Sequence, residues 1–564
     1  MTTGQGTADH WDAIVVGSGI GGLVSAGYLV ASGMRVLVLE QHDVAGGNTH
    51  VFRRRRAYQF DVGVHYIGDC APGGLLPSIL SGLGLAERVR FHPMDPDGFD
   101  RIVLPSVTVD MPTGWDRYAD RLRAALPAEA AGIDRYVEIC SVVARTCREL
   151  TRSAPDPNAK LPGAMIRWSR RTLTQLFDHC GLSARARTVL AAQSGNYGSA
   201  PAKTLVAAHT VMIDDYLRGA YYPEGGGQMI AAALVELLES HGGTLLTRAR
   251  VRRILIDGGR VTGVELTDGT THSAPVVVSN ADYRRTVLEL CDGATNLHEP
   301  VVARAESATM RLPLAVCYVA LDRELAQPNA NIWYWPGEDV ETAYARIESG
   351  DLDEVPFVFL SFTSVKDPVP GSTCPPGHTN FQIMTVCPPG YAHWGLTDGP
   401  AQGVRYRKER SYVAAKDRLT NRMLDLAEAA IGPFRDSVVH VETSTPLTQE
   451  RYTLSTGGSA YGLQGWGRTG QRPDVRTGVD GLYLVGQNIH HGGSIVGVAT
   501  CGALCASAIL DRPVLAEVCQ GTVFGNPHLL PERAPDFDPL RISRGLRRRD
   551  ARGLARMDHL VALR

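Results

Sequence analysis

An α/β fold with a parallel sheet near the N-terminus is predicted by three features that end at residue 40. Ala13 to Val16 is a short apolar run with β-branched residues, which is typical of a buried parallel strand. A glycine-rich turn follows it, and apolar residues then recur at helical spacing as far as Val30. Gly33 can end this helix, and the apolar run from Arg35 to Leu39 predicts a second strand, which leads into Glu40. Together these elements predict a βαβ unit.

The turn between the first strand and the helix has the pattern G-x-G-x-x-G, formed by Gly17, Gly19 and Gly22. Gly17 permits the tight turn, Gly19 lets the backbone approach a pyrophosphate, and Gly22 lets helix and strand pack closely. The free N–H groups at the helix N-terminus attract phosphate. Glu40 can accept a hydrogen bond from a ribose hydroxyl, and its charge disfavours a 2′-phosphate. The unit therefore predicts a dinucleotide-binding site.

Two further glycine segments favour FAD over NAD as the dinucleotide. Gly46 and Gly47 come shortly after Glu40, where flavoproteins place a second glycine pair against the cofactor. Near the other end of the chain, Gly481 to Asn488 predicts a strand that ends in a glycine and polar groups, and the helix-like stretch from Gly497 to Leu510 follows. An ordinary turn between a strand and a helix is the alternative interpretation of this late segment.

A series of motifs along the chain resembles one family of flavoproteins. The motifs are Leu39–His42, Ala45–Gly47, Phe60–Gly68, Gly195–Gly198, Tyr222–Gly226, Val278–Ala281, Lys366–Pro368, Thr445–Thr448 and the Gly486 segment. Their order is similar to that in the retinol saturase and carotenoid isomerase branch of the phytoene-desaturase-like flavoproteins, over roughly residues 11–512. Many relatives have Arg or Cys where this chain has Asn48, and an acid where it has Gln487 and Asn488. These amides can still form hydrogen bonds, so we expect FAD binding to survive.

The resemblance implies a Rossmann-like FAD-binding domain of the amine-oxidase and phytoene-desaturase type with an inserted substrate domain. A chain of 564 residues is also too long for a single core. We expect residues 11–75, 221–295 and 446–512 to form the FAD-binding domain, residues 76–220 and 296–445 the substrate and membrane-facing domain, and residues 513–564 a C-terminal extension with a basic tail. The expected cofactor-binding residues are Gly17, Gly19, Gly22, Glu40, Gln41, Gly47, Asn48, Val251, Gly486, Gln487, Asn488, Ile495 and Val496.

The resemblance also implies the chemistry. It implies an FAD-dependent oxidoreductase that transfers hydride between flavin N5 and a carbon of an apolar, carotenoid-like or retinoid-like polyene or isoprenoid, as a saturase or a desaturase. A redox-neutral cis–trans isomerase is one alternative, and a flavin-free lipid-binding relative or an amine oxidase are others. His65 and Tyr66 lie in the segment that the family places beside the flavin. His65 could exchange a proton near neutral pH, and Tyr66 could donate one. The alternative is that both side chains only form part of the pocket wall.

Composition narrows the range of partners. The formal net charge of −2 gives no reason to expect a nucleic-acid partner. The 11 cysteines form no CxxC pair, and the adjacent His490 and His491 lack a spaced third ligand, so no metal site is predicted. The scattered cysteines suit a reducing compartment, and no apolar run is long enough to span a membrane. These features predict a cytoplasmic protein and leave the oligomeric state open.

Two basic segments predict peripheral membrane contact. Residues 165–177 combine apolar and aromatic side chains with three arginines, as in a helix that lies on a bilayer. The alternative is a helix packed on its own domain with a solvated basic edge. Residues 541–564 hold eight arginines against two aspartates and form either an amphipathic helix, for lipid or for a partner subunit, or a flexible tail.

Overall fold

The first part of the fold is a five-stranded parallel sheet that begins near the N-terminus. The computed structural model describes residues 10–154, 156, 158–292, 297–465 and 472–546. The strand order is β10-β2-β1-β14-β20, and every neighbouring pair is parallel. The strands are β1 (Ala13–Val16), β2 (Val36–Glu40), β10 (Thr244–Thr247), β14 (Val277–Ser279) and β20 (Leu482–Leu484). The predicted βαβ unit is thus joined by strands from the middle and the end of the chain, and the α/β class is confirmed.

Side chains alternate between the two faces of this sheet, and each face has its own core. Ala13 and Val15 pack against helices, whereas Ile14 and Val16 pack against a three-stranded antiparallel sheet. That sheet has the order β11-β12-β13 and consists of β11 (Val251–Asp257), β12 (Arg260–Leu266) and β13 (Thr271–Ser273). The sequence pattern predicts strands at Val251 to Ile256 and at Gly263 to Leu266, which correspond to β11 and to the second half of β12. It does not predict β13, because β13 is very short and polar.

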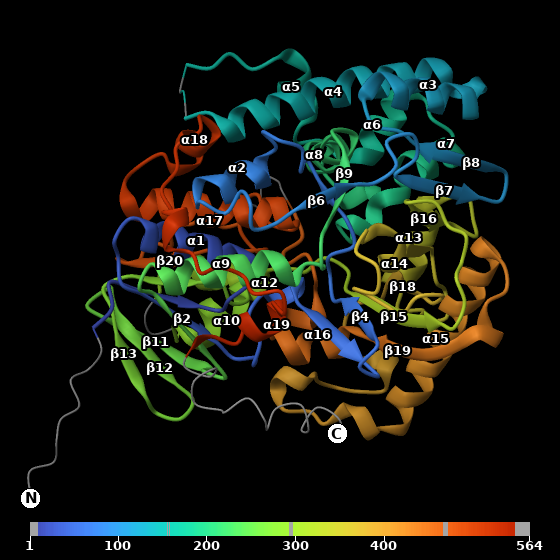
Figure 1. Cartoon of the computed structure of the whole chain (residues 1–564). Coiled ribbons are helices and arrows are strands. Elements are labelled where there is room, and N and C mark those ends of the chain that lie inside the picture. Colours follow the sequence, from blue (N-terminus) through green and yellow to red (C-terminus); the bar gives the residue numbers. More distant parts are fainter. Residues whose placement is uncertain (1–9, 155, 157, 293–296, 466–471, 547–564) are drawn as a thin grey trace, which may run out of the picture.

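Helices cover the opposite face of the parallel sheet (Figure 1). They are α1 (Ile20–Ala31), α9 (Gln228–Ser240) and α17 (Ile495–Leu510). Helices α1 and α17 pack closely because small residues face each other where they meet: a Cβ at Gly502 would lie only 2.5 Å from the carbonyl oxygen of Gly21. This packing fixes the N-termini of the two helices relative to each other.

Two segments that we expected outside the FAD-binding part pack into its core. Helices α2 (Leu75–Gly82) and α18 (Val514–Cys519) both pack against α17. Ile79 from the expected substrate domain and Leu515 from the expected C-terminal extension are buried in the same apolar cluster as α1 and α17. The sequence reveals their apolar positions but not which surface these positions cover, so tertiary contacts decide where both segments belong.

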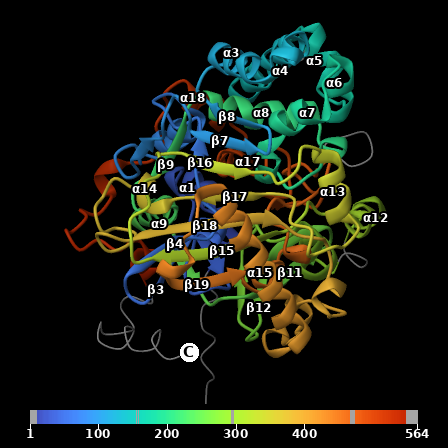
Figure 2. The ribbon, with the colours of Figure 1, turned by 90° about the vertical axis from the view of Figure 1, so that its right-hand side faces the viewer.

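The second part of the fold is built on a mixed seven-stranded sheet with the order β19-β15-β18-β17-β16-β7-β8. Figure 2 shows these strands from β8 near the top to β19 near the bottom. Strands β16 and β7 are parallel, and the other neighbours are antiparallel. The strands are β7 (Asp100–Leu104), β8 (Val107–Met111), β15 (Leu314–Leu321), β16 (Asn331–Tyr334), β17 (Val358–Ser361), β18 (Thr379–Val386) and β19 (Val438–Ser444).

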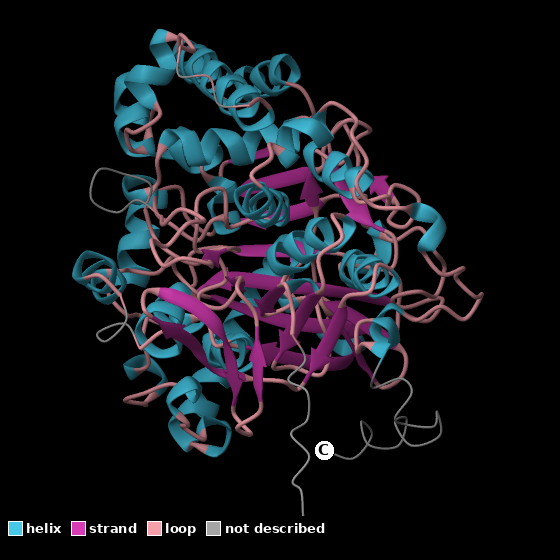
Figure 3. Cartoon of the chain, turned by 90° about the vertical axis from the view of Figure 1, so that its left-hand side faces the viewer, coloured by secondary structure: helices cyan, strands magenta, loops and turns pink. Residues whose placement is uncertain are grey.

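Helices lie on both faces of the seven-stranded sheet. On one face, α15 (Arg410–Ile431) packs against Cys317 and Val319 of β15. On the other face, Val316 and Tyr318 share a core with the helices that Figure 3 shows gathered at the top of the molecule. Those helices are α3 (Trp115–Ala125), α4 (Ala130–Arg152), α5 (Gly163–Trp168), α6 (Leu173–Cys180), α7 (Ala184–Leu190) and α8 (Val206–Leu217).

Shorter elements complete the described chain. Strands β3 (Val51–Arg54) and β4 (Tyr58–Asp61) form a hairpin, and β5 (Ile67–Gly68), β9 (Ala220–Pro223) and β6 (Phe91–Pro93) form a small antiparallel sheet. The remaining α-helices are α10 (Tyr283–Arg285), α12 (Glu299–Ser307), α13 (Val340–Glu348), α14 (Thr363–Lys366), α16 (Pro446–Thr453) and α19 (Pro539–Ile542).

The expected membrane helix at residues 165–177 is instead divided between α5 and α6. Trp168 and Leu173 are buried in the core below these helices, whereas Ile166 is 69% exposed. The apolar positions of this segment therefore mostly serve the core of the protein itself. Within the described residues, no helix has the length and the apolar character needed to cross a membrane. Residues 547–564 of the basic tail lie outside the described residues.

Candidate functional site

A long cavity runs from the glycine-rich turn after β1 to the seven-stranded sheet. We call it the first cavity. It brings together eleven of the expected cofactor-binding residues: Gly17, Gly19, Glu40, Gln41, Gly47, Asn48, Val251, Gly486, Gln487, Asn488 and Ile495. The seven-stranded sheet and its loops contribute an apolar wall of Leu314, Val316, Trp333, Phe357, Phe359 and Met384. Of the other two expected residues, Gly22 lies behind the turn and Val496 lines a neighbouring cavity.

The glycine-rich turn has the close approaches that its sequence predicts. Gly17 has a φ of 95°, which a residue with a Cβ adopts only with strain. A Cβ at Gly19 would lie 2.6 Å from the side-chain nitrogen of Asn280, and a Cβ at Gly47 would lie 3.3 Å from the Cα of Gly19. Three loops therefore meet at the N-terminus of α1, where its free N–H groups can face an anion.

Asn280 is a residue of this site that the sequence analysis did not single out. It follows β14, which pairs with β1, so the two strands end side by side. A Cβ at Gly486 would lie 2.4 Å from the Oδ1 of Asn280, so this one side chain contacts both glycine turns. The segment Val278–Ala281 is one of the motifs that carry the resemblance, and its place after a short apolar strand could have indicated a role.

Glu40 accepts hydrogen bonds from other residues of the protein. Its Oε2 accepts hydrogen bonds from the backbone N–H of Ser18 at 2.9 Å and from the Ser18 hydroxyl at 2.6 Å. Its Oε1 accepts from the backbone N–H of His42 at 2.8 Å. A carboxylate has about four acceptor positions, so a ribose hydroxyl can still donate to it. Glu40 thus orders the turn around Ser18 and also faces the first cavity.

We expect Glu40→Ala to weaken FAD retention at least tenfold, because a charge-assisted hydrogen bond is worth about 1.5–3 kcal/mol. Flavin absorbance per protein after gel filtration measures the effect. Ser18→Ala is the matched control, because it removes one donor to Glu40 and leaves the carboxylate in place. Full flavin occupancy in Glu40→Ala would show that this carboxylate does not hold the cofactor.

The expected amide ligands have protein partners as well. The Oδ1 of Asn48 accepts from the side chain of Gln449 at 2.6 Å, and the Oδ1 of Asn488 accepts from the backbone N–H of Leu463 at 3.2 Å. Both amides therefore have fixed orientations on the wall of the first cavity. Their NH₂ groups are the donors that remain to face a ligand.

A second cavity, of about 660 Å³, adjoins the first. His65 and Asn196 line both cavities, and Tyr66 lines the second alone. Much of the second cavity is apolar, with Leu75, Ala144, Val211, Met212, Val496, Leu504 and Leu515 in its wall. The ring of Tyr66 stacks on that of Tyr216, with centroids 4.1 Å apart.

His65 lies on the wall that the two cavities share. Burial lowers the pKa of His65 to about 3, so its imidazole is neutral at physiological pH. Among the described residues, its Nδ1 is buried and has no hydrogen-bond partner. Its backbone carbonyl accepts a hydrogen bond from Lys366, whose pKa burial lowers to about 7. A neutral ring with a spare nitrogen can orient a cofactor or a substrate, but it is a poor acid.

The hydroxyl of Tyr66 belongs to a buried hydrogen-bond network. It donates to Asp100 at 2.9 Å and accepts from Asn196 at 2.7 Å. Asp100 also accepts from Gln193, Asn331 and Trp333. Burial raises the pKa of Asp100 to about 6, and the same effect raises the pKa of Tyr66. The phenol is therefore held protonated and aimed at Asp100, and its ring faces the second cavity.

Comparison with known proteins identifies the family. Residues 20–510 match the family of flavin containing amine oxidoreductases. The chain belongs to this family. All-trans-retinol 13,14-reductase from Rattus norvegicus is 29% identical over 540 residues, which cover 90% of this chain and 87% of that protein. Prolycopene isomerase 2, chloroplastic, from an Oncidium hybrid cultivar is 28% identical and covers 89% and 84%.

Solved structures agree in fold. An oxidoreductase from Methanosarcina mazei superposes with a TM-score of 0.59 at 17% identity and covers 89% of this chain and 100% of that protein. As a flavin containing amine oxidoreductase, the chain is an FAD-dependent oxidoreductase with a Rossmann-like FAD-binding fold, which confirms the predicted family, cofactor and fold. The cradle of glycines around the N-terminus of α1 and the spare Nδ1 of His65 both fit FAD in the first cavity.

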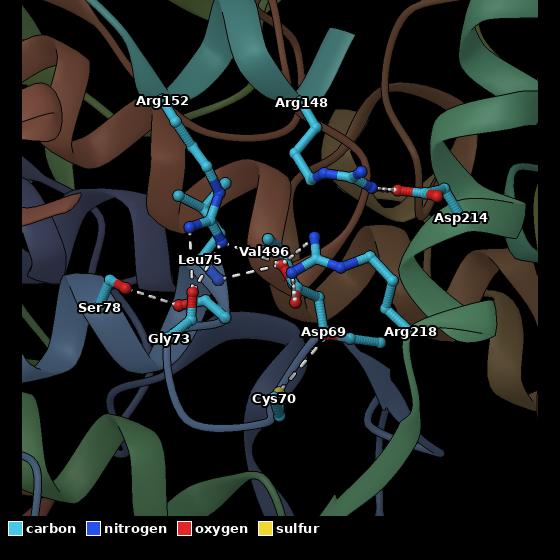
Figure 4. A network of polar contacts seen from close by, with 12 residues as sticks. Asp69, Cys70, Gly73, Leu75, Ser78, Arg148, Arg152, Asp214, Arg218 and Val496 are labelled. Carbon is cyan, nitrogen blue, oxygen red and sulfur yellow. Dashed lines mark hydrogen bonds and ion pairs between the residues drawn. The ribbon is translucent and has the colours of Figure 1, made fainter. Parts of the chain in front are cut away.

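Three arginines that line the second cavity, Arg148, Arg152 and Arg218, belong to a network of polar contacts (Figure 4). Arg148 pairs with Asp214, and Arg218 pairs with Asp69 at 2.5 Å. Arg152 lies 3.5 Å from Asp69 and donates to the carbonyl oxygen of Gly73. These three arginines therefore have carboxylate partners. Arg148 joins α4 to α8, Arg152 joins α4 to the loop before α2, and Arg218 joins the end of α8 to that loop.

Asp215 lines the same cavity, and burial together with the neighbouring Asp69 and Asp214 raises its pKa to about 8. The neutral carboxyl stabilises the fold at acidic pH, and that stability is lost as the pH rises from the unfolded value of 3.8 through about 8. We expect Asp215→Asn to raise the melting temperature at about pH 9 by roughly 2–4 °C, and to have little effect at about pH 5. Asp257→Asn, which changes an exposed aspartate, is the control. Equal shifts of the melting temperature of Asp215→Asn at both pH values would contradict the raised pKa of Asp215.

Proposed function

We propose that this FAD-dependent oxidoreductase acts on carbon–carbon bonds of an apolar polyene or isoprenoid, as a saturase or a desaturase. One observation carries the proposal: the cavity that fits FAD adjoins a second cavity of about 660 Å³ with a largely apolar wall. Long apolar substrates need such an enclosed space, because apolar side chains provide the binding energy and exclude water. The similarity to proteins named retinol reductase and prolycopene isomerase supports the same substrate class.

The cofactor, when bound, supplies hydride transfer between its N5 and a carbon of the substrate. In the proposal, the stacked rings of Tyr66 and Tyr216 hold the polyene by an apolar and aromatic surface. His65 orients the reacting region through its neutral imidazole, and Asp100 fixes the ring of Tyr66 through the phenol. Saturation adds a hydride and a proton across a double bond, and desaturation removes them.

The proposal is tested with purified protein that contains its flavin, reduced without oxygen by dithionite and incubated with a panel of polyenes. We expect a product that is two hydrogens heavier and a flavin that is reoxidised. With oxidised flavin, a product two hydrogens lighter would establish a desaturase. An unchanged mass with a changed retention time would establish the isomerase instead, in line with the prolycopene isomerase relative. Flavin that does not respond to any polyene would contradict the proposal.

Peripheral membrane contact is a further part of the proposal. Leu150 and Val211 are exposed apolar residues in the wall of the second cavity. Leu161 and Ile166 are exposed on the loop after α4 and on α5. Apolar side chains beside arginines suit the surface of an anionic bilayer, from which an apolar substrate can enter. Flotation with vesicles that contain phosphatidylserine tests this, and Ile166→Ser should reduce the bound fraction.

A further inference from the structure

Arg311 is a buried charge that has no partner within the described chain. The residue is 7% exposed, and its Nε is buried with no hydrogen-bond acceptor. Among the described residues no carboxylate forms an ion pair with it, in contrast to Arg148, Arg152 and Arg218, which line the same cavity. Burying an unpaired cation costs several kcal/mol, so such a side chain indicates a missing anion.

Arg311 lines the second cavity. Its guanidinium nitrogen Nη1 is 3.5 Å from the position of a Cβ on Gly493. Tyr461 and Gly493 line both cavities, so this guanidinium is close to the place where the two cavities meet. Gly493 immediately precedes Ser494, the N-cap of α17, and the N-terminus of this 16-residue helix adds a partial positive charge.

Within the part of the chain that the structure describes, no acidic group forms an ion pair with Arg311 in this positive region. Burial lowers the pKa of Arg311 to about 10, so it is still charged at neutral pH, and Tyr197 and Tyr461 are the groups that favour the charge. Arg472, a second buried arginine nearby, donates to the carbonyl oxygens of Leu463, Gln487 and Gly492 and has satisfied its donors. Arg311 is therefore the cation that is available to a ligand.

We propose that the substrate is a polyene or isoprenoid that ends in a carboxylate, and that Arg311 binds this carboxylate where the two cavities meet. The inference rests on the proposed function and names its substrate class more narrowly. A guanidinium matches a carboxylate with two parallel hydrogen bonds, whereas a hydrocarbon would leave the buried charge unpaired and an amine would be repelled. The apolar chain then extends along the second cavity, and the double bonds near the carboxylate end lie closest to the flavin.

The test compares two probes, all-trans-retinoic acid and all-trans-retinol, which share a polyene chain and differ in the end group. Each is titrated into the FAD-loaded protein, and the change in flavin absorbance gives the Kd. We expect the acid to bind at least tenfold more tightly than the alcohol, since only the carboxylate forms charge-assisted hydrogen bonds with the guanidinium. Arg311→Met should remove this preference by weakening the acid alone, and Arg311→Lys should restore part of it. Arg346→Met, which removes an exposed guanidinium, is the control.

The outcomes separate this inference from the proposed function. Equal affinities for acid and alcohol in the wild type, or an equal loss for both in Arg311→Met, would overturn the role of Arg311 and leave the polyene function standing. The role of Arg311 would also be overturned if Arg148→Met, and not Arg311→Met, abolished the preference for the acid over the alcohol. Loss of flavin from Arg311→Met would overturn it as well. Binding of neither probe would overturn both. Arg311→Met should fold, because no partner in the described chain loses a hydrogen bond.

Discussion

Gly22→Val should abolish flavin retention and lower the melting temperature. A Cβ at Gly22 would lie 2.6 Å from the carbonyl oxygen of Gly17 and 3.1 Å from the side chains of Val15 and Asn280. Since a carbonyl of the backbone cannot rotate away, α1 would have to move off β1, and such overpacking costs about 1–3 kcal/mol or more. The same movement would displace the N-terminus of α1 from the phosphate position.

Two measurements check this result. Flavin absorbance per protein should fall to the background level, and the unfolding transition should shift to lower temperature. Gly337→Ala is the matched control, because nothing lies within 4 Å of its Cβ position and it should change neither measurement. Normal flavin content in Gly22→Val would mean that α1 and β1 can separate without harm to the site.

Asp100→Ala should lower the free energy of unfolding by about 3–5 kcal/mol, which is the usual loss when one partner of a buried charged network is removed. Four donors would lose their acceptor: the phenol of Tyr66, the indole of Trp333 and the amides of Gln193 and Asn331. Each unsatisfied buried donor costs about 1–3 kcal/mol. Partial rearrangement of the four side chains should keep the loss of stability below the summed cost of four unsatisfied donors. The freed ring of Tyr66 should also slow turnover.

Denaturant unfolding of the flavin-loaded protein measures the effect of Asp100→Ala. Asp100→Asn should be milder, because the amide keeps one acceptor oxygen. Tyr66→Phe removes only one of the four donors and should lower the free energy of unfolding the least. This order of stability among the three variants would show that Asp100 stabilises the whole network and not only one hydrogen bond. If Asp100→Ala and Tyr66→Phe were equally stable, Asp100 would not organise this part of the protein.

The FAD-binding unit is the part of the protein that the sequence alone predicts best. Strand β1, the turn of Gly17, Gly19 and Gly22, and helix α1 are local in the chain, and each residue type has a direct physical reason for its position. The apolar pattern from Met229 to Glu239, with Gly242 and Gly243 as a stop, predicts a helix, and the structure has α9 there, one residue longer at each end. Local patterns are sufficient here because the spacing of apolar residues and the φ freedom of glycine act within a few residues.

The network around the second cavity could not be predicted in this way. Asp100 is separated from Gln193 by 93 residues and from Asn331 by 231 residues. No sequence pattern links them, since each lies on a different element and only the folded sheet and its loops bring them together. The partner of Arg54 in strand β3 could not be predicted either, because Arg54 forms an ion pair with Glu442, which is far away in the chain.

The sequence by itself therefore determined the βαβ unit and its dinucleotide site, because these depend on glycines and apolar residues at fixed local spacing. The family and FAD followed from the order of motifs along the whole chain, which resembles that of the family. The tertiary structure alone decided that α2 and α18 belong to the core around α17, that most apolar side chains of residues 165–177 pack inward, and that Arg311 is buried without a partner in the described chain. The physical reason is that burial and pairing are properties of long-range contacts. A sequence shows which side chain is charged or apolar, and only the fold shows what surrounds it.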